Sequence, residues 1–196
     1  MGNCNRRKLN ELKTEEYREI IKMKDVKVFL SEKDIKEKGA ELGKQISEDY
    51  RGSDKNLLVI SILKGSVIFL SDLIRNIDVD LSIDFMVISS YGRSTTSKGN
   101  VKIIKDLDIN ISNYDLLIVE DILDSGYTLS KLLEILKVRK PKSLKICTLL
   151  DKPDRRVVNV DLDYCGFTVP DEFIVGYGLD YDEKYRNLPY IGILEP

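Results

Sequence analysis

The stretch that most constrains the fold of this chain runs from residue 116 to residue 129. Residues 116–119, Leu-Leu-Ile-Val, are typical of a strand that is buried on both faces. The pair Glu120-Asp121 follows, then Asp-Ser-Gly-Tyr-Thr at 124–128, where helical periodicity begins. A buried strand that passes through a glycine turn into a helix predicts one unit of a parallel α/β sheet.

This turn has the chemistry of a phosphate site. Gly126 can adopt a positive φ and allows close approach to the backbone, and the hydroxyls of Ser125 and Thr128 can donate to a phosphate. The free amides at a helix N-terminus and the helix dipole favour an anion at the same place. The simpler alternative is that Asp124 or Ser125 only caps the helix.

The two acids just before the turn need a different partner. Glu120 and Asp121 would repel a bare phosphate, so we expect them to bind ribose hydroxyls or a hydrated divalent cation. A sugar phosphate satisfies both halves of the stretch. The pattern is neither a Walker loop nor the Gly-x-Gly-x-x-Gly dinucleotide fingerprint, neither of which occurs in the chain.

Composition narrows the chemistry further. The chain has no histidine, so a general base must be a carboxylate, lysine, tyrosine or thiolate, and histidine-dependent triads and metal sites are excluded. With 31 basic and 33 acidic residues, the charge balance predicts no nucleic-acid partner. The apolar runs are only strand-length, so no membrane span is expected.

The cysteines and the N-terminus indicate the compartment and the domain boundary. Cys4, Cys147 and Cys165 have neither metal-ligand nor redox-pair spacing, and Cys147 lies in an apolar strand, which favours a reducing cytoplasm. Residues 1–24 are interpreted as a charged N-terminal extension. Residues 25–196 are expected to form a single domain.

The remaining pattern alternates strands and helices. Strands are expected near 26–30 and at 57–63, 79–90, 101–105 and 144–150, and helices at 31–50, 67–76 and 128–139. The alternation predicts an α/β fold with a mostly parallel, twisted sheet flanked by helices.

Three of these strands end in polar residues. Leu63 is followed by Lys64-Gly65, Val119 by Glu120-Asp121, and Leu150 by Asp151-Lys152. Because ligands of such sheets bind beyond the carboxyl ends of the strands, the three ends together would form a site.

These pieces resemble the type I phosphoribosyltransferases, and within them the 6-oxopurine branch, the hypoxanthine-guanine phosphoribosyltransferases. Besides the 120–128 signature, the matching segments are Leu63-Lys64-Gly65-Ser66, Ser90-Tyr91, Asp151-Lys152, Phe173-Ile174-Val175-Gly176-Tyr177-Gly178-Leu179-Asp180-Tyr181 and Arg186. The resemblance implies a small hood built from N- and C-terminal segments, including about 151–190. It also implies a cytoplasmic homodimer or homotetramer that acts in purine salvage.

The resemblance assigns one group of residues to phosphoribosyl diphosphate (PRPP) and Mg²⁺. Residues 125–128 (Ser125, Gly126, Tyr127 and Thr128) would hold the 5-phosphate, and Glu120 and Asp121 the ribose. Lys64 and Gly65, preceded by a cis peptide in many relatives, would face the diphosphate. Arg186 would pair with diphosphate oxygens, and Asp180 would reach a Mg²⁺ through water. Ser90 and Tyr91 would begin a lid over residues 90–100.

A second group would bind the purine. Lys152 would donate to O6, Phe173 would stack on the ring, and the Ile174 backbone would read the edge near N1 and C2. Asp124 would face N7, and the resemblance counts Asp180 with the purine-binding residues as well as with the metal. The implied reaction transfers the 5-phosphoribosyl group of PRPP to N9 of hypoxanthine or guanine, which gives IMP or GMP and diphosphate.

Two other functions remain open at this point. One is a phosphoribosyltransferase for another base, such as adenine, xanthine, orotate or uracil, which a panel of bases would distinguish. The other is a nucleotide-sensing RNA-binding regulator on the same fold, which should show salt-sensitive RNA binding without transferase activity.

Overall fold

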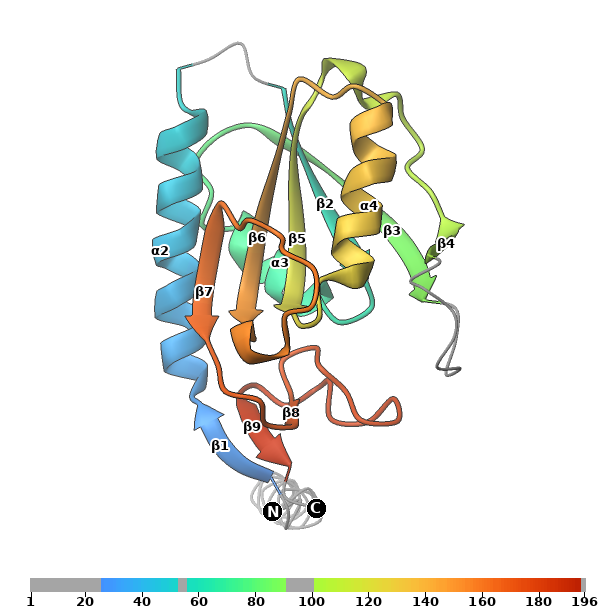
Figure 1. Cartoon of the computed structure of the whole chain (residues 1–196). Coiled ribbons are helices and arrows are strands. Elements are labelled where there is room, and N and C mark those ends of the chain that lie inside the picture. The colour runs from blue at the N-terminus through green and yellow to red at the C-terminus, as the bar shows by residue number, and fades with distance from the viewer. Residues whose placement is uncertain (1–25, 53–55, 91–100, 195–196) are drawn as a thin grey trace, which may run out of the picture.

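The computed structural model describes residues 26–52, 56–90 and 101–194. Within them the larger sheet has six strands in the order β4-β3-β2-β5-β6-β7 (Figure 1). These strands are β2 (Leu57–Leu63), β3 (Leu81–Ser90), β4 (Val101–Lys105), β5 (Asp115–Leu123), β6 (Ser143–Asp151) and β7 (Tyr164–Thr168). Every neighbouring pair is parallel except β3 and β4. The predicted mostly parallel α/β sheet is confirmed.

Helices cover both faces of this sheet. Helices α2 (Glu32–Tyr50) and α3 (Val67–Ile74) pack on one face and α4 (Tyr127–Val138) on the other (Figure 1). Side chains alternate along β2: Leu57 and Val59 join the core under α2 and α3, whereas Leu58 and Ile60 join the core under α4. Continuous apolar runs are therefore needed in the central strands, because both of their faces are buried.

Several boundaries differ from the prediction by a few residues. β5 continues past Val119 to Leu123, because the parallel ladder with β6 extends to the pair Leu123 and Asp151. The acids Glu120 and Asp121 therefore lie within the strand instead of after it. Similarly, α3 ends at Ile74 and β3 begins at Leu81.

The hood is a small antiparallel sheet in the order β1-β9-β8. It joins β1 (Val26–Leu30) to β9 (Ile191–Leu194) and β9 to β8 (Ile174–Val175), so N- and C-terminal segments build it together. The expected hood range of 151–190 is too wide at its start, because β7 (Tyr164–Thr168) belongs to the larger sheet. The predicted extension, residues 1–24, lies outside the described residues.

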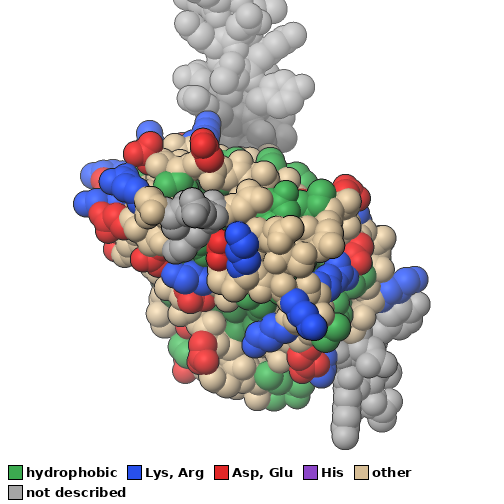
Figure 2. All heavy atoms as spheres, turned by 90° about the horizontal axis from the view of Figure 1, so that it is seen from above, with side chains coloured by type: hydrophobic (Ala, Val, Ile, Leu, Met, Phe, Trp, Pro, Cys, Tyr) green, Lys and Arg blue, Asp and Glu red, His purple; other side chains and the backbone are tan. Residues whose placement is uncertain are grey.

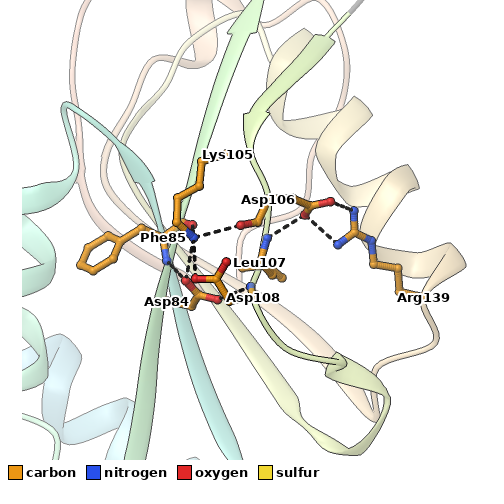
Figure 3. Close-up of polar contacts among 7 residues, drawn as sticks. All are labelled: Asp84, Phe85, Lys105, Asp106, Leu107, Asp108 and Arg139. Carbon is orange, nitrogen blue, oxygen red and sulfur yellow. Dashed lines mark hydrogen bonds and ion pairs between the residues drawn. The ribbon is translucent and has the colours of Figure 1, made fainter.

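An ionic network fastens the edge of the larger sheet to α4 (Figure 3). Lys105 Nζ lies 3.2 Å from carboxylate oxygens of both Asp84 and Asp108. Arg139 binds both carboxylate oxygens of Asp106 at 2.7 Å through two nitrogens. Bidentate pairs of this kind fix geometry as well as supplying energy. The network therefore holds β4 and the following loop against β3 and the C-terminal end of α4.

Candidate active site

Three parallel strands of the larger sheet have their C-terminal ends side by side, as predicted. β2, β5 and β6 are adjacent and parallel, so Lys64-Gly65, the acid pair and Lys152 lie at the same end of the sheet. A Cβ atom placed on Gly65 would lie 1.7 Å from Asp121 Oδ2, and one on Gly178 would lie 2.0 Å from the Gly65 carbonyl oxygen. The loop after β2 is thus packed between the acid pair and residues 176–178.

The turn between β5 and α4 has the geometry of an anion site. Gly126 is the N-cap of α4 with φ +84°, so the predicted positive φ is confirmed. The first backbone hydrogen bond of the turn runs from the Ser130 amide to the Gly126 carbonyl, at 2.9 Å. The amides before Ser130 therefore have no acceptor within the helix, and the helix dipole adds to their attraction for an anion. Tyr127 is exposed and Thr128 is half-buried.

Residues 155–158 brace this turn from outside. The amides of Val157 and Val158 both donate to the Ser125 carbonyl at 3.0 Å. Arg156 Nε donates to the Asp124 carbonyl at 2.9 Å, and Arg155 Nε donates to Asp124 Oδ1 at 2.8 Å. Neither arginine was predicted from the sequence as part of the site. The available signal was their position, two adjacent cations just after the polar end of a strand.

The acid pair has unusual electrostatics. Burial and the neighbouring charge of Asp121 raise the pKa of the Glu120 carboxyl well above its usual range. Burial raises the pKa of Asp121 to about 6. Both carboxylates are therefore costly to ionise in the free protein, and a ligand that donates hydrogen bonds or brings positive charge would relieve that cost.

This cost predicts a pH dependence of stability without ligand. A carboxyl whose pKa rises from 3.8 to about 6 on folding is protonated in the native state between these values, while the unfolded chain is ionised. Stability therefore falls as pH rises from about 4 to 6, and the cost, about 3 kcal/mol, is complete above pH 6. Asp121→Asn should accordingly raise the Tm more at pH 7.5 than at pH 5, by roughly 5 °C. Thermal denaturation of both proteins at both pH values tests this, and an equal difference at the two pH values would contradict it.

The predicted diphosphate side gathers charged groups of both signs. Lys64 Nζ lies 3.1 Å from Glu183 Oε2, and Arg186 Nη2 lies 2.8 Å from Asp180 Oδ1. Arg186 also donates to the Gly178 carbonyl at 2.8 Å. Its Nε is buried and has no hydrogen-bond partner among the described residues. Peptide bond Leu63–Lys64 is cis.

The predicted purine side begins at the C-terminal end of β6, two strands along from β2. Lys152 is buried, and its Nζ donates to the Glu172 carbonyl at 2.5 Å. Phe173 is 52% exposed and meets the Tyr181 ring edge-on, with centroids 5.4 Å apart, so it offers a free aromatic surface. Ile174 is buried in β8, which pairs only with β9 among the described strands and leaves its other edge open.

Ser66 and the predicted lid at residues 90–100 are the remaining positions that the resemblance singled out. The Ser66 hydroxyl, in the matching segment 63–66, is buried and donates to the Ile62 carbonyl at 2.6 Å, so it faces the core. The backbone of Ser90 ends β3 opposite Val101. Tyr91 and the rest of the predicted lid, up to residue 100, lie outside the described residues.

Comparison with known proteins identifies the family. Residues 25–182 match the model of the phosphoribosyl transferase domain. The chain belongs to this family. It is 56% identical over 167 residues to the hypoxanthine phosphoribosyltransferase of Buchnera aphidicola, a match covering 85% of this chain and 94% of the relative. To the hypoxanthine-guanine phosphoribosyltransferase of Bacillus subtilis it is 55% identical, with 87% and 93% covered.

The fold of the chain matches that of a solved hypoxanthine phosphoribosyltransferase. A crystal structure of a hypoxanthine phosphoribosyltransferase from Staphylococcus aureus superposes with a TM-score of 0.85 at 55% identity, covering 88% of this chain and 94% of that one. The type I phosphoribosyltransferase fold, which was expected from the resemblance, is therefore confirmed, and so is membership in the phosphoribosyltransferase family.

Proposed function

We propose that this protein transfers the 5-phosphoribosyl group of PRPP to N9 of a 6-oxopurine, with hypoxanthine and guanine as the bases and IMP or GMP and diphosphate as products. The observation that carries the proposal is that the loop after β2, the acid pair of β5 and Lys152 after β6 lie together at the same end of the larger sheet. Lys152 is buried just after β6, which neighbours β5 and the turn at residues 124–128, and the exposed Phe173 follows Glu172, whose carbonyl accepts a hydrogen bond from Lys152 Nζ. The Lys152 amide donates to the Leu123 carbonyl at 3.0 Å, which links the purine side directly to that turn.

The sugar phosphate has a binding group for each of its parts. The amides of 125–128 and the Ser125 and Thr128 hydroxyls would hold the 5-phosphate, while Glu120 and Asp121 would accept hydrogen bonds from the ribose hydroxyls. Lys64, Gly65 and Arg186 would face the diphosphate. For this, the two cations must exchange Glu183 and Asp180 for phosphate oxygens, an exchange between ion pairs that are partly exposed to solvent.

Mg²⁺ fits this edge as an ion shared with the substrate. No cluster of three or more histidine, cysteine or acidic side chains suited to a metal occurs among the described residues. Mg²⁺ commonly takes only one or two carboxylates and keeps waters and substrate phosphates as its other ligands. Asp180, and Glu120 and Asp121 through ribose hydroxyls or water, would hold it. When bound, the ion would neutralise charge on the departing diphosphate.

Recognition of the purine would depend on donor and acceptor matching. The Lys152 ammonium only donates, so it pairs with a 6-oxo group and opposes the 6-amino group of adenine. Because a buried donor left without a partner is costly, such a site can discriminate more strongly than shape alone. Phe173 would stack on the ring, and the open edge of β8 at Ile174 would read the side of the base near C2.

Asp124 would act on the imidazole side of the purine. In the transfer, the bond from C1 of the ribose to the diphosphate oxygen breaks, the bond from C1 to N9 forms, and the purine loses a proton. Asp124 would accept that proton at N7, and its negative charge would favour the cationic character that develops on the sugar.

An assay of PRPP-dependent nucleotide formation tests the proposed function. With Mg²⁺ present, hypoxanthine and guanine should be converted, and adenine, orotate and uracil should not. Conversion of a different base, or salt-sensitive RNA binding without any transfer, would overturn the proposal in favour of one of the two alternatives.

At one end of the molecule, the distribution of charged side chains does not support the RNA-binding alternative. Figure 2 shows acidic and basic side chains interspersed at the end of the larger sheet opposite the candidate site. Electrostatic binding of a nucleic-acid backbone favours a continuous basic surface instead.

The remaining expectations concern the setting of the enzyme. Cys147 and Cys165 are free thiols, which supports a reducing, cytoplasmic compartment. No helix in the described part of the chain is long and apolar enough to cross a membrane. A homodimer or homotetramer stays a prediction, which sedimentation of the full chain would test.

A further inference from the structure

Arg155 links two parts of the proposed purine site. Its Nε donates to Asp124 Oδ1 at 2.8 Å, and its Nη1 lies 3.3 Å from Asp171 Oδ1. Asp124 follows β5, whereas Asp171 precedes the Glu172-Phe173 segment on the purine side. The guanidinium therefore connects the carboxylate that would receive the purine proton to the segment that would stack on and read the base.

The backbone that carries Arg155 is held firmly. It lies in the 3-10 turn Pro153–Arg155, where its amide donates to the Lys152 carbonyl at 3.2 Å. The neighbouring Arg156 anchors the same segment, donating to the carbonyls of Leu123 and Asp124 and pairing with the Asp151 carboxylate. The origin of the Arg155 side chain is thus fixed relative to the turn that bears Asp124.

The contact uses only one oxygen of the Asp124 carboxylate. Among the described residues, Oδ1 accepts from Arg155, and Oδ2 accepts no hydrogen bond. The Asp124 side chain is 45% exposed, so a ligand can approach it from solvent. Without a partner on Oδ1, the side chain could rotate between staggered positions and about its broad carboxylate torsion.

The contacts of Arg155 contribute little to folding. The side chains of Arg155, Asp124 and Asp171 are 50%, 45% and 52% exposed, and ion pairs of this exposure add little to stability. A geometric contact of small energetic value beside a reacting group suits orientation of that group better than support of the fold.

We propose that Arg155 is a positioning residue for the transfer reaction: it holds Asp124 Oδ1 so that Oδ2 is directed to the N–H of the purine imidazole. This inference rests on the proposed function. A displaced catalytic group loses rate even when every substrate contact remains, so Arg155 should affect kcat and leave PRPP binding unchanged.

The test is steady-state kinetics and thermal denaturation of the full-length protein. Arg155→Gln should lower kcat by about tenfold, with the KM for PRPP changed by less than about twofold and the Tm essentially unchanged. In the Asp124→Asn background the same substitution should cause no further loss, because the residue that it positions is already altered. An unchanged kcat, or an equal loss in both backgrounds, would overturn the proposal.

Two further variants separate orientation from charge and from folding. Asp171→Asn keeps the bond to Asp124 and weakens only the second anchor, so its loss of kcat should be smaller. Arg155→Lys keeps the positive charge but not the two-nitrogen bridge, and should recover only part of the lost rate; it also decides the question if Arg155→Gln folds poorly. Full recovery by lysine would reject orientation. Absence of transfer by the unmodified protein would instead reject the proposed function.

Discussion

Asp124→Asn is expected to lower kcat by about two to three orders of magnitude while PRPP still binds, because it removes both a proton acceptor and a negative charge next to the reacting sugar. The substitution keeps the shape of the side chain and leaves the amides of the anion-binding turn unchanged. Titration of PRPP binding and single-turnover kinetics with hypoxanthine would measure the two effects separately.

The matched control for this variant is Asp154→Asn. Asp154 is exposed and lies in the same 3-10 turn as Arg155. The Asp154→Asn substitution therefore removes one nearby negative charge and leaves the proposed purine contacts intact. Its kcat should stay within about twofold of the unmodified protein, as is usual for exposed substitutions. Equal kcat values for Asp124→Asn and the unmodified protein would remove Asp124 from the proposed role.

Gly65→Ala is expected to lower kcat/KM for PRPP by about a hundredfold, since an added Cβ would lie 1.7 Å from Asp121 Oδ2 and must displace that carboxylate or the loop. The backbone of Gly65 has little room to shift, because Gly178 packs so closely that a Cβ placed on Gly178 would lie 2.0 Å from the Gly65 carbonyl oxygen. The variant should therefore impair the ribose and diphosphate sides together, which PRPP titration and initial rates would detect.

Gly39→Ala is the control for the same chemical change. Gly39 lies within α2, and an added Cβ there would meet no atom within 4 Å apart from its chain neighbours and the nearby backbone of the helix itself. Alanine favours a helix interior by up to about 1 kcal/mol over glycine, so this variant should be fully active and at least as stable as the unmodified protein. If Gly65→Ala behaved like Gly39→Ala, the close packing of Gly65 on the acid pair would have no functional importance.

The parts of the fold that depend on periodicity could be predicted from the sequence. The apolar runs at 57–63 and 116–119 indicated strands buried on both faces, and the polar residues that follow them placed a site at one edge. The positive φ at Gly126 followed from the chemistry of a strand–turn–helix connection.

Other features depend on contacts between segments that are distant in sequence. The extension of β5 through Glu120 to Leu123 results from its ladder with β6, which no local pattern in β5 contains. Arg155 and Arg156 contact Asp124 only because residues 153–158 fold back on the turn at residues 123–126. β7 joins the larger sheet through pairing with β6, so its residues could not be assigned to sheet or hood from alternation alone.

The most direct test of the central claim is a crystal structure of the protein with bound IMP. The phosphate should lie on the amides of residues 125–128 and the ribose hydroxyls on Glu120 and Asp121, with the base between Lys152 and Phe173. A nucleotide bound away from this edge, or one whose phosphate lies elsewhere than on that turn, would contradict the assignment.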